Sequence, residues 1–279
     1  MNVLSIQSGV VFGHVGNATA QFCLQRLGHE VWRIDTVRFS NHPGHGAPMG
    51  EVTASGEITR LVQGLATHGW LPSCDALLTG YLGAAEQGPG ILDIARQVRA
   101  ANPAAIWLVD PVIGDNGRVF VKPGIPEFMR DHAVPHADIV TPNAFELAWL
   151  TGLPADGVEM AIAAARALRG TRRQIVIATG VDAGDGAIAT LALHDDGVDI
   201  ITTPRVAIAA NGTGDSLAAI FLARLLSTRD VAGALAHAAS AVCALLRATA
   251  ASGMRELELI ATQEAIIAPA PLHQARRIA

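Results

Sequence analysis

The chain has 279 residues, of which 50% are hydrophobic and 16% are charged, and its formal net charge is −5. This composition excludes a disordered chain, because the apolar side chains suffice to form a buried core without a disulfide or a structural metal. The acidic balance and the lack of a basic stripe argue against nucleic acid as a partner.

Short apolar runs alternate along the chain with segments of helical spacing. In chain order, the runs typical of strands are 2–7, 30–39, 76–79, 105–109, 138–140, 175–178, 187–194 and 198–203. The segments typical of helices are 17–27, 55–68, 87–101, 144–150, 158–168, 215–226, 230–247 and 263–267. Ser55 is predicted to cap the second of these helices. Residues 38–50 are rich in glycine, proline and histidine, and they predict an irregular loop that acts as a lid.

This alternation predicts an α/β fold, a three-layer sandwich in which a mostly parallel sheet is covered by helices on both faces. The last two strands flank Asp195-Asp196-Gly197 and predict an antiparallel hairpin. No linker or change in composition divides the chain, so we expect a single domain over residues 1–279. Ligands bind such sheets at the carboxyl ends of the strands, which here are the loops after residues 7, 39, 79, 109, 140 and 203.

Cysteine usage and hydropathy bear on the compartment. Cys23, Cys74 and Cys243 lie far apart in apolar surroundings, which is typical of reduced core thiols in a cytoplasmic protein. The first basic residue is Arg26, so the N-terminal segment lacks the positive region of a signal peptide. Residues 231–246 are the most apolar stretch, but they are short for a membrane span, and we expect a buried helix and no membrane partner.

The positions of the lysine and histidine residues argue against two kinds of binding site. Lys122 is the only lysine and is not preceded by the glycine pattern of a Walker A loop, so that kind of phosphate site is excluded. His42 and His45 lie in the glycine-proline loop and are expected to belong to the loop or to face a substrate rather than to bind a metal.

The segment Asn211-Gly212-Thr213-Gly214-Asp215-Ser216 leads into an apolar helix. Glycines at 212 and 214 allow backbone amides to converge, and a helix N-terminus adds about half a positive charge. The segment therefore suits a phosphoryl group, with Asp215 positioned to take a proton from an attacking hydroxyl. An alternative is equally compatible with this motif alone: Asp215 is only the N-cap of the helix, and the glycines only make a turn.

Two further polar motifs directly follow predicted strands. Asp110 comes after 105–109, where a carboxylate is well positioned for a phosphate-metal site, although Asp-Pro is also a common turn. Asn143 and Glu146 come after 138–140. Glu146 can hold a magnesium ion through water, or it can complete an ordinary capping box with Asn143.

Other strands also end in distinctive residues. Gln7-Ser8-Gly9 ends the first strand, and Tyr81, the only tyrosine, lies in Thr79-Gly80-Tyr81-Leu82-Gly83 after another. The ring and hydroxyl of Tyr81 suit an aromatic substrate, although a core tyrosine with one hydrogen bond is the commoner case. The glycines after the first strand lack G-x-G-x-x-G order, so the signal for a dinucleotide site is weak.

Together these motifs resemble those of the ribokinase-like kinases and, within them, the pyridoxal kinase family. The resemblance covers the whole chain and is carried by residues 5–17, by Thr36-Val37-Arg38-Phe39-Ser40-Asn41-His42, by Thr79-Gly80-Tyr81-Leu82-Gly83, by Asp110-Pro111-Val112, by Thr141-Pro142-Asn143-Ala144-Phe145-Glu146 and by Gly212-Thr213-Gly214-Asp215. It implies a ribokinase-like fold and an enzyme that uses ATP and Mg²⁺ to phosphorylate the 5′-hydroxymethyl group of pyridoxal, pyridoxine and pyridoxamine. The product from pyridoxal is pyridoxal 5′-phosphate, in vitamin B6 salvage. A homodimer is also implied, and a monovalent cation such as K⁺ is a further candidate cofactor.

The resemblance implies a role for each matching residue. Asp215 is the base, and Gly212, Thr213 and Gly214 form the anion hole for the γ-phosphate. The residues implied on the substrate side are Ser8, Tyr81, Pro43, Gly44 and Asp215. Those implied on the ATP side are Asp110, Thr141, Asn143, Glu146 and Thr179, with Asp110 and Glu146 at the metal. We expect adenine between residues 205–210 and the helix that follows Asp230.

The chain departs from the family pattern at a few positions. Gly9 stands where the family usually has histidine, Pro43-Gly44-His45-Gly46 replaces a threonine and an aromatic residue, and Thr179 stands where many members have lysine. The segment before the anion hole, residues 204–210, is short. Alternative functions are therefore a hydroxymethylpyrimidine kinase, a catalytically weak protein that binds a B6 vitamer and, more distantly, a nicotinamide oxidoreductase.

Overall fold

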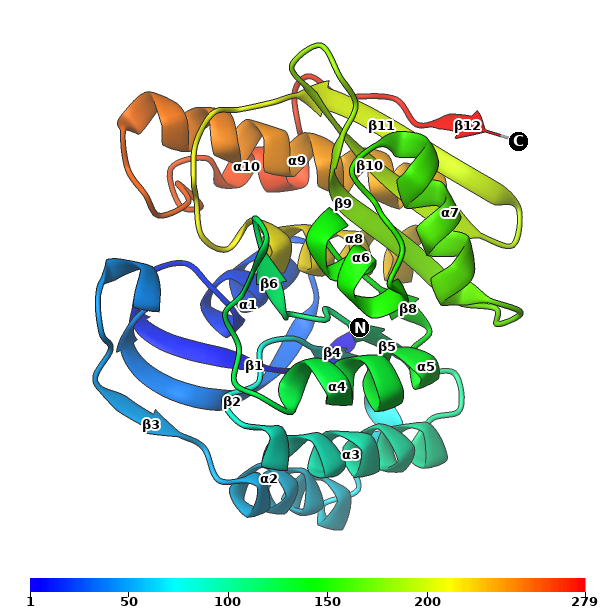
Figure 1. The fold of residues 1–279 in the computed structure, drawn as a ribbon. Helices are drawn as coiled ribbons and strands as arrows, with labels where there is room; N and C mark the ends of the chain where they lie inside the picture. The colour runs from blue at the N-terminus through cyan, green and yellow to red at the C-terminus, as the bar shows by residue number, and fades with distance from the viewer. Residues whose placement is uncertain (279) are drawn as a thin grey trace.

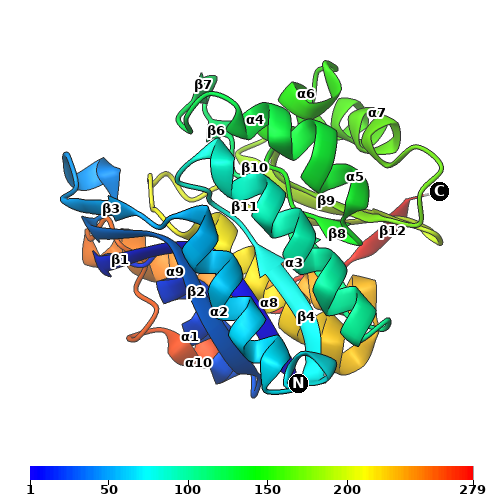
Figure 2. The same cartoon turned by 90° about the horizontal axis from the view of Figure 1, so that it is seen from below.

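The computed structural model of the protein describes residues 1–278. The strands are β1 Asn2–Phe12, β2 Glu30–Asn41, β3 Gly50–Val52, β4 Cys74–Thr79, β5 Ile106–Val109, β6 Gly114–Asp115, β7 Arg118–Val119, β8 Ile139–Val140, β9 Ile175–Asp182, β10 Ala187–His194, β11 Gly197–Pro204 and β12 Arg276–Ile278. Within the described residues, ten strands form one sheet in the order β12-β11-β10-β9-β8-β5-β4-β1-β2-β3 (Figure 1), and β6 pairs with β7 (Figure 2). The strands from β9 to β2 in this order are parallel, and β3, β10, β11 and β12 are antiparallel to their neighbours.

Helices cover both faces of the sheet (Figures 1 and 2). The α-helices are α1 Asn17–Arg26, α2 Ser55–Thr67, α3 Gly88–Ala101, α4 Ile125–Phe128, α5 Val134–His136, α6 Ala144–Thr151, α7 Val158–Arg169, α8 Thr213–Thr228, α9 Val231–Ser252 and α10 Gln263–Ile267. Four further helical turns, three of them 3₁₀ and the last a π-helix, are η1 Pro43–His45, η2 Leu71–Ser73, η3 Ala85–Gln87 and η4 Met129–Ala133. The predicted α/β sandwich with a mostly parallel sheet is confirmed.

Alternate side chains of the central strands enter two separate cores. Leu4 and Ile6 of β1 pack with residues of α2 to α7, whereas Val3 packs on the opposite face with α1, α8, α9 and α10. In the same way Leu77 of β4 enters the first core and Leu78 enters the second. Because both faces are covered, these strands are apolar along their length, which is why the sequence shows short apolar runs rather than polar-apolar alternation.

The helix α9 is long and apolar enough, by length and composition, to cross a membrane. Most of its apolar stretch is nevertheless buried inside the protein, where it packs against α8 in the second core. The prediction of a buried helix for this segment is confirmed.

The prediction of an irregular loop over residues 38–50 is wrong in part. The strand β2 continues to Asn41, β3 begins at Gly50, and η1 lies between them. Backbone pairing of Arg38 with Glu51 and of Phe39 with Gly50 extends the sheet, so pairing at the sheet edge outweighs the turn-forming residues. For the same reason β1 does not end near residue 7, because it pairs with β2 as far as Phe12.

Other local predictions also need correction. Ser55 begins α2 but does not cap it, since the N-cap is Ala54 and no side chain caps the helix. The β6–β7 hairpin was not predicted from the sequence. Its turn residues Asn116 and Gly117 have φ values of 50° and 77°, and Asn-Gly is a strong sequence signal for such a hairpin.

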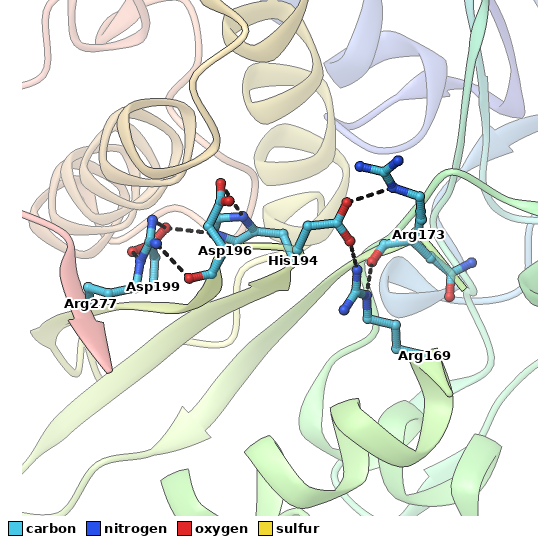
Figure 3. A network of polar contacts seen from close by, with 8 residues as sticks. Arg169, Arg173, His194, Asp196, Asp199 and Arg277 are labelled. Carbon is cyan, nitrogen blue, oxygen red and sulfur yellow. Dashed lines mark hydrogen bonds and ion pairs between the residues drawn. The ribbon is translucent and has the colours of Figure 1, made fainter. Parts of the chain in front are cut away.

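A network of charged residues joins the C-terminal strand β12 to the β10–β11 hairpin (Figure 3). The buried carboxylate of Asp199 lies 2.8 Å from Nε2 of His194 and accepts hydrogen bonds from Arg277 at 2.5 and 3.0 Å. Because β10 runs antiparallel to β9 and His194 lies near the start of β9, this network is at the opposite end of the sheet from the carboxyl ends of the parallel strands. We therefore expect its role to be structural.

Candidate functional site

The carboxyl ends of β5 and β8 bring two buried polar residues together. Asp110 follows β5 and Thr141 follows β8, and these strands are parallel neighbours in the sheet. The hydroxyl of Thr141 donates a hydrogen bond to Oδ1 of Asp110 at 2.9 Å. The prediction that polar residues converge at this edge is confirmed for this pair.

The start of α6 adds Asn143 and Glu146 to the same place. Asn143 caps the helix, and the two residues form the capping box that the sequence allowed. The carboxylate of Glu146 also accepts hydrogen bonds from the backbone N–H groups of Ile113 at 2.9 Å and Gly114 at 3.3 Å. Glu146 therefore links its helix to the loop that follows Asp110, which an ordinary cap does not require.

Thr179 of β9 lies beside this group. Its backbone N–H donates to the carbonyl of Pro142 at 3.0 Å, and it forms an isolated parallel bridge with Asn143. Asp110 and Thr141 thus form one pair, and Asn143, Glu146 and Thr179 form a second set of contacts that begins two residues after Thr141.

The first turn of α8 carries Asp215. The helix begins at Thr213, so the N-cap is Gly212 and not Asp215, and the interpretation of Asp215 as the cap is wrong. Gly212 has φ 83°, and a Cβ there would lie 1.9 Å from the carbonyl oxygen of His14, so only glycine fits. Asp215 Oδ2 accepts a hydrogen bond from the N–H of Gly16 at 2.8 Å.

The substrate-side residues approach the same helix terminus from β1 and η1. Ser8 is buried against Gly16, the residue that donates to Asp215. Gly44 of η1 lies against Asn211, because a Cβ on Gly44 would be 3.4 Å from the side-chain nitrogen of Asn211. Pro43 precedes Gly44 in the same exposed turn.

Tyr81 lies two residues after the end of β4, the neighbour of β1 in the sheet. Its side chain packs against the first core, and its carbonyl accepts a hydrogen bond from the hydroxyl of Thr36 at 2.7 Å. Burial raises the pKa of the Tyr81 hydroxyl. The residue is therefore at the predicted edge of the sheet, next to the strand that carries Ser8.

Three carboxyl groups at this edge influence one another. Burial raises the pKa of Asp110, and the charge of Asp215 raises it further. Burial and the charge of Asp110 likewise raise the pKa of Glu146, while the pKa of Asp215 is raised by burial. Gly214 connects the two sides of the site, because a Cβ there would be 3.8 Å from Oδ2 of Asp110.

Closely spaced buried carboxyl groups suit a cation, which relieves their repulsion, and oxygen is the ligand atom that Mg²⁺ prefers. Among the described residues no group of three or more histidine, cysteine or acidic side chains could hold a metal by itself. A magnesium ion here would be held by one or two carboxylates and by oxygens from phosphate and water, which is usual for this ion.

The structure also shows features that the sequence analysis did not identify. Glu256 contacts His14, His45 and Asn211, although it is 242 residues from the first of these. It lies in Arg255-Glu256-Leu257-Glu258, where nothing in the sequence distinguishes it from the neighbouring charged residues or indicates its partners.

Two grooves open on the surface of the described chain. One of about 400 Å³ lies between residues 207–209 and the end of α9, where adenine was expected. A larger one of about 480 Å³ lies between β2 and α2 and is lined by Trp32, Arg33, Ile34, Leu61, Leu65 and Trp70. None of the predicted site residues lines the larger groove. We therefore place the candidate site at the carboxyl ends of the parallel strands and not in that groove.

Comparison with known proteins gives a consistent family assignment. A family model described as phosphomethylpyrimidine kinase matches residues 73–259. The pyridoxal kinase PdxY of Rubrobacter xylanophilus is 46% identical, over 100% of this chain and 98% of the relative. That of Granulibacter bethesdensis is 45% identical, over 96% of this chain and 97% of the relative. The chain belongs to the pyridoxal kinase family.

Solved structures of this family have the same fold. The pyridoxal kinase of Leishmania donovani in complex with ADP and pyridoxamine superposes with a TM-score of 0.93 at 28% identity, over 100% of this chain and 99% of that one. The pyridoxal kinase of Trypanosoma brucei gives a TM-score of 0.89 at 29% identity, over 99% of each chain. The ribokinase-like fold implied by the sequence motifs is confirmed.

Proposed function

We propose that the protein transfers the γ-phosphoryl group of ATP to the 5′-hydroxymethyl group of pyridoxal, and also accepts pyridoxine and pyridoxamine. The reaction on pyridoxal gives pyridoxal 5′-phosphate in vitamin B6 salvage. The observation that carries the proposal is the position of Asp215, a carboxyl group in the first turn of α8, directly after the Gly212–Gly214 segment. The names of the relatives, and the L. donovani complexes with ADP and pyridoxamine or pyridoxine, support this assignment.

The proposed mechanism relies on position and charge. The N–H groups of Gly212, Thr213 and Gly214 and the dipole of α8 attract the γ-phosphate. The alcohol oxygen bonds to the γ-phosphorus, the bond from that phosphorus to the ADP oxygen breaks, and the alcohol proton passes to Asp215. Burial raises the pKa of Asp215, which makes its carboxylate a better proton acceptor.

We assign the remaining predicted residues to two sides of this centre. Ser8, Tyr81, Pro43 and Gly44 are proposed to bind the B6 ring, because β1, β4 and η1 reach the centre from one side. Thr141, Asn143 and Thr179 are proposed to bind the ATP phosphates from the other side, since Thr141 contacts Asp110 and Asn143 forms a bridge with Thr179. Adenine is proposed to occupy the groove beside residues 207–209.

Asp110 and Glu146 are proposed to hold magnesium together with the ATP phosphates. Their burial and mutual repulsion fit a cation at this position. When bound, Mg²⁺ neutralises charge on the β- and γ-phosphates. A requirement for K⁺ is tested by activity in potassium compared with a bulky organic cation.

Three broader expectations also stay proposals. We propose a homodimer, a cytoplasmic location and a single domain. The three cysteines are buried free thiols, as expected in a reducing compartment, and one sheet extends from β3 to β12. Sedimentation tests the dimer, fractionation of cells tests the compartment, and limited proteolysis tests the domain.

A hydroxymethylpyrimidine kinase is the second candidate. The family model that matches residues 73–259 is described as phosphomethylpyrimidine kinase, and the two alcohols present similar primary hydroxyl groups.

The test is magnesium-dependent release of ADP from ATP with pyridoxal, pyridoxine, pyridoxamine or hydroxymethylpyrimidine supplied separately. We expect release with the B6 vitamers at a kcat/KM above that with the pyrimidine. A preference for the pyrimidine supports the second candidate. Binding of a vitamer without ADP release shows a binding protein instead.

A further inference from the structure

Three distant segments meet at the side chain of Glu256, a buried residue that follows α9. Its Oε2 accepts the N–H of His14 at 2.5 Å, and its Oε1 lies 2.5 Å from Nε2 of His45 and 3.3 Å from Nδ2 of Asn211. Burial alone would raise the pKa of Glu256, but the hydrogen bonds from His45, His14 and Asn211 bring it below the ordinary value. The group is therefore an ionised carboxylate, which can only accept, so Nε2 of His45 is the donor.

The contacts with Asn211 and His14 lie at the wall of the anion hole, and the contact with His45 lies at the turn beside it. Asn211 directly precedes Gly212, and the carbonyl oxygen of His14 lies against Gly212. His45 is the last residue of η1, the turn whose Gly44 lies against Asn211. Glu256 thus connects the wall of the anion hole to the turn that adjoins it.

The other side-chain bonds that hold the turn are local: Nδ2 of Asn41 donates to the carbonyls of His42 at 3.0 Å and Gly46 at 3.2 Å. None of its residues Pro43–His45 is buried, so apolar packing does not fix it. By contrast, the side chain of His45 is only 21% exposed, because it is directed to Glu256 and meets the ring of Phe12 edge-on at 5.5 Å. A charge-assisted hydrogen bond to a buried carboxylate therefore ties this exposed turn to a segment distant in the sequence, in addition to its local bonds from Asn41.

We propose that Glu256 is a positioning residue that holds the 42–46 turn against the anion hole through His45. This inference rests on the proposed function. The held turn keeps water from the γ-phosphorus, so that the alcohol attacks instead. When the turn is released, a water oxygen bonds to the γ-phosphorus and the bond to the ADP oxygen breaks. ADP, inorganic phosphate and a proton are then released without a phosphorylated vitamer.

The test compares substitutions that remove or keep the donor at position 45. His45→Leu removes the hydrogen bond, whereas His45→Gln keeps an N–H group that reaches the carboxylate. Glu256→Gln removes the charge and keeps the shape. Glu264→Gln is the matched control. Glu264 lies in the same C-terminal segment as Glu256, and its substitution removes only an exposed ion pair with Arg26.

Two quantities are measured for each variant: inorganic phosphate released per phosphorylated vitamer, and the rate of amide hydrogen exchange in residues 42–47. For His45→Leu we expect both to rise by about tenfold or more, which is the effect expected from loss of a charge-assisted hydrogen bond. We expect Glu256→Gln to show a smaller rise in the same direction. His45→Gln and Glu264→Gln should stay close to the wild type.

Unchanged exchange in His45→Leu would overturn the proposal whether or not the protein is a kinase, because this readout needs no activity. Faster exchange with an unchanged phosphate ratio in an active enzyme would overturn the role in water exclusion. Equal defects in His45→Leu and His45→Gln would also contradict it, since the donor would then be irrelevant. An inactive wild type with a released turn in His45→Leu would instead contradict the proposed function.

Discussion

At the scale of single residues, Gly9 is explained by its neighbour Asp35. A Cβ on Gly9 would lie 2.4 Å from the carboxyl carbon of Asp35, which is held by Asn17 at 2.7 Å and by Arg33 at 2.8 Å. The family histidine expected at this position has no room here unless Asp35 moves. The sequence showed the departure, but its cause lies on the neighbouring strand.

We predict that Gly9→Ala destabilises the protein by about 1–3 kcal/mol, as expected when an extra carbon is forced into a packed site. Unfolding in urea measures this change. In a protein that already carries Asp35→Ala, adding Gly9→Ala should change the free energy of unfolding very little, because the obstructing carboxyl group is gone. If Gly9→Ala unfolds like the wild type, the steric explanation is wrong.

Asp110 shows the conflict between stability and function. In metal-free protein its pKa is raised by burial and by the charge of Asp215. A carboxyl group whose pKa is raised by folding stabilises the fold fully below its unfolded pKa, and this contribution is lost as pH rises through the folded value.

We therefore predict that Asp110→Asn raises the stability of metal-free protein by about 1–3 kcal/mol above neutral pH and lowers kinase turnover by roughly two orders of magnitude. The gain should shrink on acidification, because Asp110 is then neutral in the wild type as well. Unfolding in EDTA across pH, together with turnover, tests this. A variant that is less stable at alkaline pH, or fully active, would contradict the assignment.

At the scale of elements, residues 38–50 show where local signals are insufficient. Glycine and proline correctly indicated a turn at 43–46, but β2 and β3 pair on either side of it. Whether two segments more than ten residues apart pair as strands depends on the edge strand available to them and not on their local composition. The same applies to β12, which is a strand because it pairs with β11.

The network around Asp199 predicts a purely structural role for the C-terminal strand. Asp199→Asn should cost about 1–3 kcal/mol, because the buried acceptor of His194 and Arg277 loses its charge. KM and kcat should not change, since the network lies far from the strand ends that carry the site. Asp196→Asn is the control, because Asp196 is exposed and 3.7 Å from His194. A change in kcat with unchanged stability would refute this role.

At the scale of the whole molecule, the parallel sheet explains why much of the site was predictable. Strand ends converge in any such sheet, so Asp110, Thr141 and Asp215 could be grouped from their places after predicted strands or before a helix. The contacts of Glu256, which follows α9, could not be predicted, because nothing in the sequence relates this residue to His14 or His45. The adenine position was predicted only as a region, and the groove beside residues 207–209 lies within it.

We predict that Ala209→Phe fills this groove and raises KM for ATP by about tenfold or more, with little change in KM for pyridoxal. Steady-state kinetics with each substrate varied in turn measures both. Leu61→Phe in the groove between β2 and α2 is the control and should change neither constant. If Ala209→Phe raises only KM for pyridoxal, adenine does not bind there.

We propose above all that this sheet edge phosphorylates a B6 alcohol with Asp215 as the base. The most direct test of this proposal is a single-turnover measurement of pyridoxal 5′-phosphate and ADP formed from MgATP and pyridoxal, by the wild type and by Asp215→Asn. We expect equal amounts of the two products from the wild type, and a rate lower by roughly two or more orders of magnitude in the variant with nearly unchanged ATP binding. A wild type that binds both substrates without forming product, or a variant that reacts at the wild-type rate, would contradict the account.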